Sequence, residues 1–201
     1  MIDIQYVFEL FGTVVFAISG ALAADERKKH DWFGIAVYAF ITAVGGGTLR
    51  DIFLNSYPLV WINDMNVIFS VFIGIILAGV FFNYFSRLRK TFMFFDTLGI
   101  ALFTIVGLEK AHSLGANDFI SVLMGMFTAV FGGVLRDILI NKTPTIFVQE
   151  IYATACIIGG IVYLILESLG IDRNINFIIS GAVIAIIRII TVKYNLSLPK
   201  F

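Results

Sequence analysis

Hydrophobic and polar positions are grouped in long blocks along this chain. Apolar stretches of about 20 residues alternate with short polar segments. A helix needs about 20 apolar residues to cross the hydrocarbon core of a bilayer, where it must satisfy its own backbone hydrogen bonds. The pattern therefore predicts an all-α integral membrane protein with seven transmembrane helices. The predicted spans are 4–24, 32–50, 65–86, 91–108, 119–136, 148–169 and 175–194.

Composition agrees with a membrane protein. Of the 201 residues, 59% are hydrophobic and only 14% are charged, and the mean hydropathy is +0.96. Soluble domains carry about 25% charged residues. A soluble enzyme, a disordered chain and a nucleic-acid-binding protein are therefore disfavoured. The 14 basic residues balance the 14 acidic ones, so any functional electrostatics must be local.

Basic residues predict how the chain is oriented, because Lys and Arg are retained on the cytoplasmic side of a membrane. Ten lie in loops one, three and five and in the C-terminal tail, and three lie on the other side. The N-terminus is thus expected outside the cytoplasm and the C-terminus inside it. The ten are Arg27, Lys28, Lys29, Arg87, Arg89, Lys90, Arg136, Lys142, Lys193 and Lys200, and the three are Arg50, Lys110 and Arg173.

The chain contains an internal repeat. The segment GGTLRDIFLN at 46–55 recurs 86 positions later as GGVLRDILIN at 132–141. With one residue of slippage the first and fourth spans also match. The matching pairs are Glu9 with Asp96, Gly12 with Gly99, Phe16 with Phe103 and Gly20 with Gly107. This similarity divides the chain into repeat one at 1–86, repeat two at 87–172 and an extra helix at 173–201.

Each repeat holds three predicted spans, which is an odd number, so the second copy must enter the membrane upside down. The fold class predicted is an inverted 3+3 repeat plus a seventh helix within a single membrane domain. Many transport proteins have such inverted repeats, with the functional pathway at the repeat interface.

Glycines lie at equivalent depths in the second and fifth spans, at Gly45, Gly46 and Gly47 and again at Gly132 and Gly133. One interpretation is that they break the helix and expose carbonyl oxygens that attract cations in a water-filled path. The other is that small residues let two helices pack closely. The recurrence in both copies favours a broken helix at each of two constrictions in series. Phe131 stands where the first copy has Gly45, so the two constrictions need not be equal.

An arginine-aspartate pair follows each glycine motif, Arg50 with Asp51 and Arg136 with Asp137. The functional interpretation is that these charges control entry to each constriction, and the alternative is that the arginines snorkel to the interface. Adjacent residues project about 100° apart on a helix, so each arginine is expected to pair with another group rather than with its neighbour.

Other polar residues give weaker signals. Glu9 and Asp96 could concentrate cations at the mouths of a path or simply complement helix N-termini. Arg188 in the last span is expected to snorkel toward the cytoplasm. The two histidines have no Cys partners and no helical His spacing, and no catalytic motif is present. Neither an enzyme, a metal site nor a cofactor is therefore expected.

The repeated GG-x-L-R-D-I element, the inverted repeat, the seventh span and the length together resemble the prokaryotic trimeric intracellular cation (TRIC) channels, across essentially the whole chain. Bacterial members also carry the name glycine transporters. The resemblance implies a homotrimer in a bacterial inner membrane, with one pore per protomer for monovalent cations such as K⁺ and Na⁺. It places the helix bends at Gly45–Gly47 and Gly132–Gly133, and the pore charges at the two arginine-aspartate pairs.

Passive cation conduction is therefore the leading hypothesis, because a channel needs only a hydrated path with suitable dipoles and charges. The expected partners are monovalent cations, membrane lipids and two further copies of the chain, with no nucleic acid. The alternative is a secondary transporter for glycine or a similar small zwitterion, since inverted repeats also suit alternating access. The sequence leaves K⁺ against Na⁺ preference, the gating stimulus and lipid regulation open.

Overall fold

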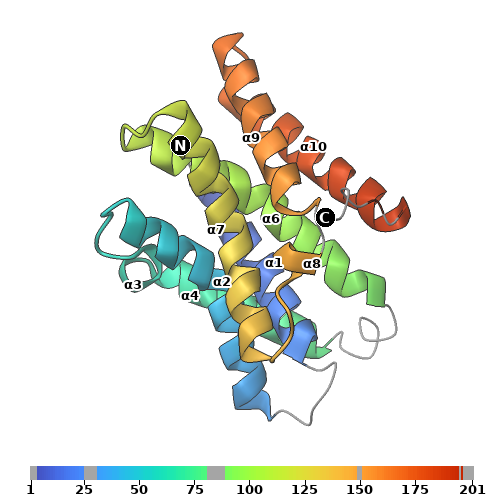
Figure 1. The fold of residues 1–201 in the computed structure, drawn as a ribbon. Coiled ribbons are helices and arrows are strands. Elements are labelled where there is room, and N and C mark those ends of the chain that lie inside the picture. The colour runs from blue at the N-terminus through green and yellow to red at the C-terminus, as the bar shows by residue number, and fades with distance from the viewer. Residues whose placement is uncertain (1–3, 25–30, 81–88, 149–150, 195, 197–201) are drawn as a thin grey trace.

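The protein is a bundle of helices, and no strand occurs in the part of the chain that the structure describes (Figure 1). This computed structural model describes residues 4–24, 31–80, 89–148, 151–194 and 196. Their helices are α1 (Ile4–Ala24), α2 (Trp32–Phe53), α3 (Val60–Asn63), α4 (Met65–Val80), α6 (Arg89–Ser113), α7 (Asp118–Leu139), α8 (Thr145–Val148), α9 (Ala153–Ser168) and α10 (Arg173–Tyr194).

Five of these helices, α1, α2, α6, α7 and α10, are long and apolar enough to cross a membrane. α4 and α9 are apolar but have 16 residues each. For the predicted span 65–86, residues 81–86 lie outside the described part of the chain, as does the predicted repeat boundary at 86/87. The predicted span 148–169 begins too early, because α8 ends at Val148 and α9 begins only at Ala153.

α2 and α7 end later than predicted, at Phe53 and Leu139 instead of Arg50 and Arg136. Each helix is followed by an asparagine in the left-handed region, Asn55 with φ 51° and Asn141 with φ 57°, a conformation that commonly terminates helices. The arginine-aspartate pair therefore belongs to the last turns of each helix rather than to a loop.

The N-terminal ends of the same two helices are also alike. The carboxylate of Asp31 accepts a hydrogen bond from the Gly34 N–H at 2.7 Å, and the side chain of Asn117 accepts one from the Ile120 N–H at 2.9 Å. Such caps satisfy backbone donors that a helix leaves unpaired. Asp31 and Asn117 are 86 positions apart, so the register of the repeat extends beyond the segment that the sequence comparison identified.

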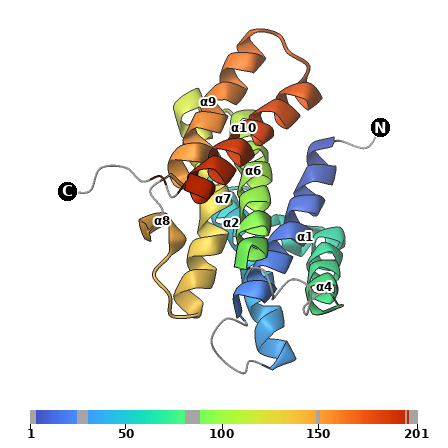
Figure 2. The same ribbon diagram turned by 90° about the vertical axis from the view of Figure 1, so that its right-hand side faces the viewer.

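Contacts between helices follow the same correspondence. α1 packs against α2 and α4, as α6 packs against α7 and α9, and the two sets meet through α1 with α6 and α2 with α7. α10 packs against α9 and α6. Figure 2 shows α4 beside α1 on one side of the bundle and α9 with α10 on the other.

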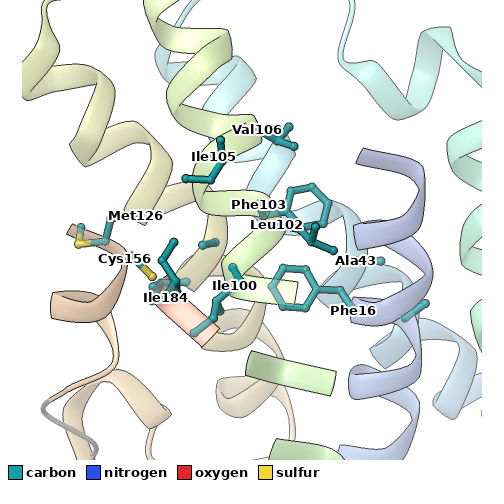
Figure 3. Close-up of a cluster of buried hydrophobic side chains, with 14 of the residues drawn as sticks. Phe16, Ala43, Ile100, Leu102, Phe103, Ile105, Val106, Met126, Cys156 and Ile184 are labelled. Carbon is teal, nitrogen blue, oxygen red and sulfur yellow. The ribbon is translucent and has the colours of Figure 1, made fainter. Parts of the chain in front are cut away.

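Two phenylalanines from corresponding positions meet in the middle of the core. The rings of Phe16 on α1 and Phe103 on α6 are stacked, with centroids 5.1 Å apart and planes 7° from parallel, in the buried cluster of Figure 3. Phe103 lies over Gly12, where a Cβ would be 3.0 Å from its ring, and Phe16 lies over Gly99, where a Cβ would overlap its ring. The two contacts are reciprocal.

The predicted helix breaks at Gly45, Gly46 and Gly47 and at Gly132 and Gly133 are wrong. α2 and α7 are each one continuous helix through these positions. A Cβ on Gly46 would overlap the carbonyl oxygen of Thr128, and a Cβ on Gly132 would overlap that of Thr42. The glycines therefore allow the two helix backbones to cross closely. This is the second of the two interpretations of the motif, in which small residues let membrane helices pack closely.

Gly47 and Gly133 do something different. A Cβ on Gly47 would meet only the Nη2 atom of Arg50, at 3.7 Å, and one on Gly133 would lie 3.4 Å from Nη2 of Arg136. The last glycine of each motif thus lies beside the guanidinium group one turn later, where a Cβ would make only ordinary van der Waals contact.

Candidate functional site

Four charged side chains gather where α2 ends, and we call this group cluster one: Glu9, Arg50, Asp51 and Lys110. The Nε atom of Arg50 lies 2.9 Å from Oδ1 of Asp51, and Nη2 of Arg50 lies 3.4 Å from Oε1 of Glu9. Lys110, from the last turn of α6, places its Nζ 2.7 Å from the same Asp51 oxygen. Two cations and two carboxylates balance there, which reduces the energetic penalty of burying them.

The second oxygen of Asp51 fixes the chain that follows α2. Its Oδ2 accepts a hydrogen bond from the Val60 N–H at 3.1 Å, which holds the start of α3 against the end of α2. The indole N–H of Trp61 donates to the Thr48 hydroxyl at 3.1 Å. The short helix α3 is therefore part of the wall around cluster one.

A corresponding group lies where α7 ends, and we call it cluster two: Asp96, Arg136, Asp137 and Tyr152. The Nε atom of Arg136 lies 2.9 Å from Oδ1 of Asp137, and its Nη1 lies 2.9 Å from Oδ1 of Asp96. The Tyr152 hydroxyl donates to the other Asp96 oxygen at 2.9 Å. Both carboxylate oxygens of Asp96 are therefore occupied.

Further groups enclose the Arg136 guanidinium and the Asp137 carboxylate. Nη1 of Arg136 also donates to the Ser19 hydroxyl at 3.1 Å. The Cζ atom of Arg136 lies 4.7 Å from the centroid of the Phe92 ring. Oδ2 of Asp137 accepts from both the N–H and the hydroxyl of Thr145, each at 2.9 Å. Thr145 begins α8 much as Val60 begins α3, so both aspartates hold a short helix in place.

The expectation that neighbouring Arg and Asp would not pair is wrong in both copies. The Nε atom of each arginine lies 2.9 Å from Oδ1 of the adjacent aspartate, despite the angular separation of the two residues. Snorkelling is also wrong, because Arg50 and Arg136 are fully buried. Each arginine does bond a second acid as well, Glu9 or Asp96, from the preceding helix.

The clusters differ in their access to solvent. In cluster one the side chains of Glu9 and Lys110 are 17% and 21% exposed, whereas no charged side chain of cluster two exceeds 5%. A cavity of about 20 Å³ extends beside cluster one from Glu9 and Thr13 to Phe103, enough for about one water molecule. Cluster one therefore opens on a small cavity, and cluster two is enclosed.

A larger cavity of about 460 Å³ lies between the ends of α6, α9 and α10. On its wall the Glu109 carboxylate accepts from the Tyr163 hydroxyl at 2.5 Å and from Nη2 of Arg173 at 2.9 Å. Among the described residues no group of three His, Cys, Asp or Glu side chains is placed to hold a metal ion.

Three contributors to the clusters were not identified from the sequence. Lys110 was counted only as a loop charge, Ser19 gave no signal, and Tyr152 lies in an apolar run. The expectation that Arg188 snorkels toward the cytoplasm is wrong, because it is buried, donates to the Ile151 carbonyl at 3.0 Å and lies against the Tyr152 ring. The equivalence of Glu9 and Asp96 could have suggested their arginine partners, because both pairs recur in both copies.

The chain is similar to known membrane proteins over nearly its whole length. The family model described as Glycine transporter matches residues 6–83 and 93–168. A UPF0126 membrane protein of Vibrio cholerae is 37% identical, covering 99% of this chain and 83% of the relative. The UPF0126 inner membrane protein YadS of Escherichia coli is also 37% identical, covering 98% of this chain and 95% of the relative.

Solved structures extend the similarity to the fold. The TRIC trimeric intracellular cation channel orthologue from Rhodobacter sphaeroides superposes with a TM-score of 0.88 at 31% identity, covering 96% of this chain and 99% of that one. A second solved structure, from work on the structural basis for conductance through TRIC cation channels, superposes with a TM-score of 0.85 at 34% identity. The match covers 100% of this chain and 98% of that one. This multi-pass membrane protein therefore belongs to the Glycine transporter family, whose solved relatives are the TRIC cation channels.

Proposed function

We propose that this protein is a monovalent cation channel, with a path in each protomer that runs between α1, α2, α6 and α7. The observation that carries the proposal is the presence of corresponding buried charged clusters at the ends of α2 and α7, together with the buried stack of Phe16 on α1 against Phe103 on α6. Ionisable groups inside a membrane protein are expensive and usually mark ion or proton pathways. The similarity to TRIC channels supports the same function.

The proposed path has its pore charges at Arg50, Asp51, Arg136 and Asp137, with Glu9 and Asp96 as the acids that face the arginines. Gly47 and Gly133 lie beside the guanidinium groups, whereas Gly45, Gly46 and Gly132 serve the helix crossing. In this proposal, the stacked phenylalanines and the enclosed cluster two separate the two ends of the path. Conduction then requires a rearrangement at both places.

We further propose seven membrane spans in which 1–86 and 87–172 form inverted copies and 173–201 adds the last helix. The reciprocal contacts of Phe16 with Gly99 and of Phe103 with Gly12 support this relationship. The proposed location is a bacterial inner membrane, with the N-terminus outside the cytoplasm. The assembly proposed is a homotrimer surrounded by lipid, by similarity to the TRIC trimers. Of the residues on which the orientation depends, 27–29, 87 and 200 lie outside the described chain.

The test is reconstitution of the purified protein into planar bilayers with a KCl gradient. Discrete current steps that reverse nearer the equilibrium potential of K⁺ than that of Cl⁻ support the channel. Replacing K⁺ by Na⁺ measures the preference between the two cations. Saturable glycine counterflow in vesicles without current steps would instead establish a carrier and refute the channel.

A further inference from the structure

The cavity of about 460 Å³ between the ends of α6, α9 and α10 belongs to neither charged cluster, and the proposed path does not use it. Cavities that bind small organic molecules in proteins have volumes of about 300–1,000 Å³. One water molecule, by comparison, takes up about 30 Å³ in the liquid. The cavity is therefore much larger than a water molecule or a bare ion needs, and its size suits an organic molecule.

One of the two carboxylates on the cavity wall is already neutralised. The side chain of Glu109 is only 6% exposed, and both of its oxygens accept hydrogen bonds from Arg173. Nε of Arg173 lies 3.2 Å from Oε1, and Nη2 lies 2.9 Å from Oε2. The Tyr163 hydroxyl donates to Oε1 as well. Glu109 and Arg173 therefore balance each other and leave no charge for a ligand.

The second carboxylate, that of Glu167, is not balanced in this way. Its side chain is 48% exposed, and within the described chain its one ionic contact is Nδ1 of His112, 3.6 Å from Oε2. Histidine loses its charge between about pH 5 and pH 8. Among the described residues that line the cavity, two carboxylates then face the single guanidinium of Arg173, so one negative charge remains.

The helix ends around the cavity favour the same sign of ligand. α6 ends at Ser113 and α9 at Ser168, and the C-terminal end of a helix carries a partial negative charge. α10 begins here with the opposite sign, but the Asp172 carboxylate accepts from the N–H groups of Asn174 at 3.0 Å and Ile175 at 3.3 Å. That acid complements the positive end of α10. The cavity is therefore suited to a cation.

We propose that this cavity binds a small organic cation through a primary ammonium group, with Glu167 as its counter-ion. An ammonium group has three N–H donors, which need acceptors. Besides the carboxylate, the Ser113 hydroxyl lines the cavity and keeps acceptor capacity while it donates to the Lys110 carbonyl at 2.8 Å. A free amine and the ethanolamine headgroup of a lipid offer the same ammonium group. The site does not depend on whether the protein conducts ions.

The test uses ethanolamine hydrochloride as the probe and the whole protein in phosphatidylglycerol nanodiscs at about pH 8, where histidine is neutral. A ligand that binds only the folded protein raises its melting temperature. Ethanolamine should therefore give a saturable rise that equal NaCl does not give. Ethylene glycol has nearly the same size but no charge, and should give no such rise. No saturable rise with ethanolamine, or an equal one with ethylene glycol, would overturn the proposal.

Glu167→Gln locates the site, because it removes the charge and keeps the size of the side chain. The apparent affinity for ethanolamine should fall at least about tenfold, the effect of losing a hydrogen bond to a charged group. Asp118→Asn is the matched control, since Asp118 is an exposed acid at the start of α7 and does not line the cavity. Wild-type affinity in Glu167→Gln, or an equal loss in both variants, would refute this site.

A second variant tests the cavity by its volume, in case Glu167→Gln does not fold. Ile171 lies on the cavity wall and is 39% exposed, so Ile171→Trp should fill the space and abolish the saturable rise. An unchanged rise in Ile171→Trp would contradict binding in this cavity.

The source of the ammonium group is decided by replacing phosphatidylglycerol with phosphatidylethanolamine. If the lipid headgroup occupies the cavity, added ethanolamine should lose its effect on the wild type, and this supports the site with a lipid as occupant. An unchanged effect supports the site with a soluble amine as occupant. Bilayer recordings of the wild type answer the separate question of conduction, so a protein that passes no current but binds ethanolamine refutes only the channel.

Discussion

The Nζ atom of Lys110 lies 2.7 Å from Oδ1 of Asp51, so the last turn of α6 is joined directly to the last turn of α2. This ion pair connects the two copies at the accessible cluster. The repeat does not carry this lysine over to cluster two, because the positions 86 and 87 residues before Lys110 are Ala24 and Ala23. The two ends of the proposed path are therefore chemically different despite their common sequence motif.

Lys110→Met should increase cation current, because it removes a positive charge beside Asp51 and leaves the carboxylate more available to an entering cation. We expect unitary conductance to rise about twofold at low KCl, with a smaller difference at high KCl because salt screens exposed charges. Recordings over a range of KCl concentrations measure this effect. Lys193→Met is the control, because Lys193 is an exposed lysine in the last turn of α10. A change in Lys110→Met that does not depend on salt would contradict an electrostatic origin.

Asp51→Asn should have the opposite effect. The substitution leaves Arg50 and Lys110 with Glu9 as their acid, so cation current should fall. Removing one partner from a buried ion pair costs about 3–5 kcal/mol, so the melting temperature in detergent should fall too. Asp137→Asn removes the corresponding acid of cluster two and should be comparably destabilising, since Arg136 is buried. A stable Asp51→Asn protein with unchanged current would show that this carboxylate faces neither a path nor a structural partner.

The glycines predict a sharp contrast within one motif. Gly46→Ala should destabilise the protein by at least about 1–3 kcal/mol, the usual penalty for overpacking, because its Cβ would overlap a backbone carbonyl that cannot move aside. Gly47→Ala should melt near wild type, since only the end of the Arg50 side chain lies within 4 Å of the new atom. Thermal unfolding of the two variants measures the contrast, and equal melting temperatures would refute the close crossing of α2 and α7.

Phe16→Ala should open the centre of the proposed path. It removes one of two stacked rings, which should raise conductance, and truncating a buried Phe costs about 3–5 kcal/mol. Phe103→Ala should give a similar change in both properties, because each ring packs on a glycine of the opposite copy. Current recordings and melting curves of both variants test this equivalence. A large effect from one ring and none from the other would refute a shared central barrier.

Most of the helical layout could be predicted from the sequence, because span length and the 86-residue register are visible in the hydrophobic pattern. The end of α2 was missed by three residues, since the left-handed conformation of Asn55 depends on how the chain turns after Asp51. The role of Gly46 was misread because glycine favours both bending and close packing, and only the position of Thr128 decides between them.

Within the candidate site, the arginines and aspartates were identified but their partners were not. Sequence separation gives no information on whether Lys110 reaches Asp51 across 59 positions. Likewise, Arg188 resembles a snorkelling residue until the packing of α10 against α9 and α6 shows that its side chain is directed inward. Long-range pairing depends on helix rotation, which periodicity alone does not determine.

The reciprocal crossing, in which Gly46 meets Thr128 and Gly132 meets Thr42, has an evolutionary consequence. In a half-length ancestor, two identical chains lying antiparallel would make both contacts with a single glycine and a single threonine, so one mutation would alter two places at once. Fusion of two such copies into one chain would remove that coupling. Each half would then be free to acquire its own residues: in the register of the repeat, Lys110 corresponds to Ala24 and Tyr152 to Asn66.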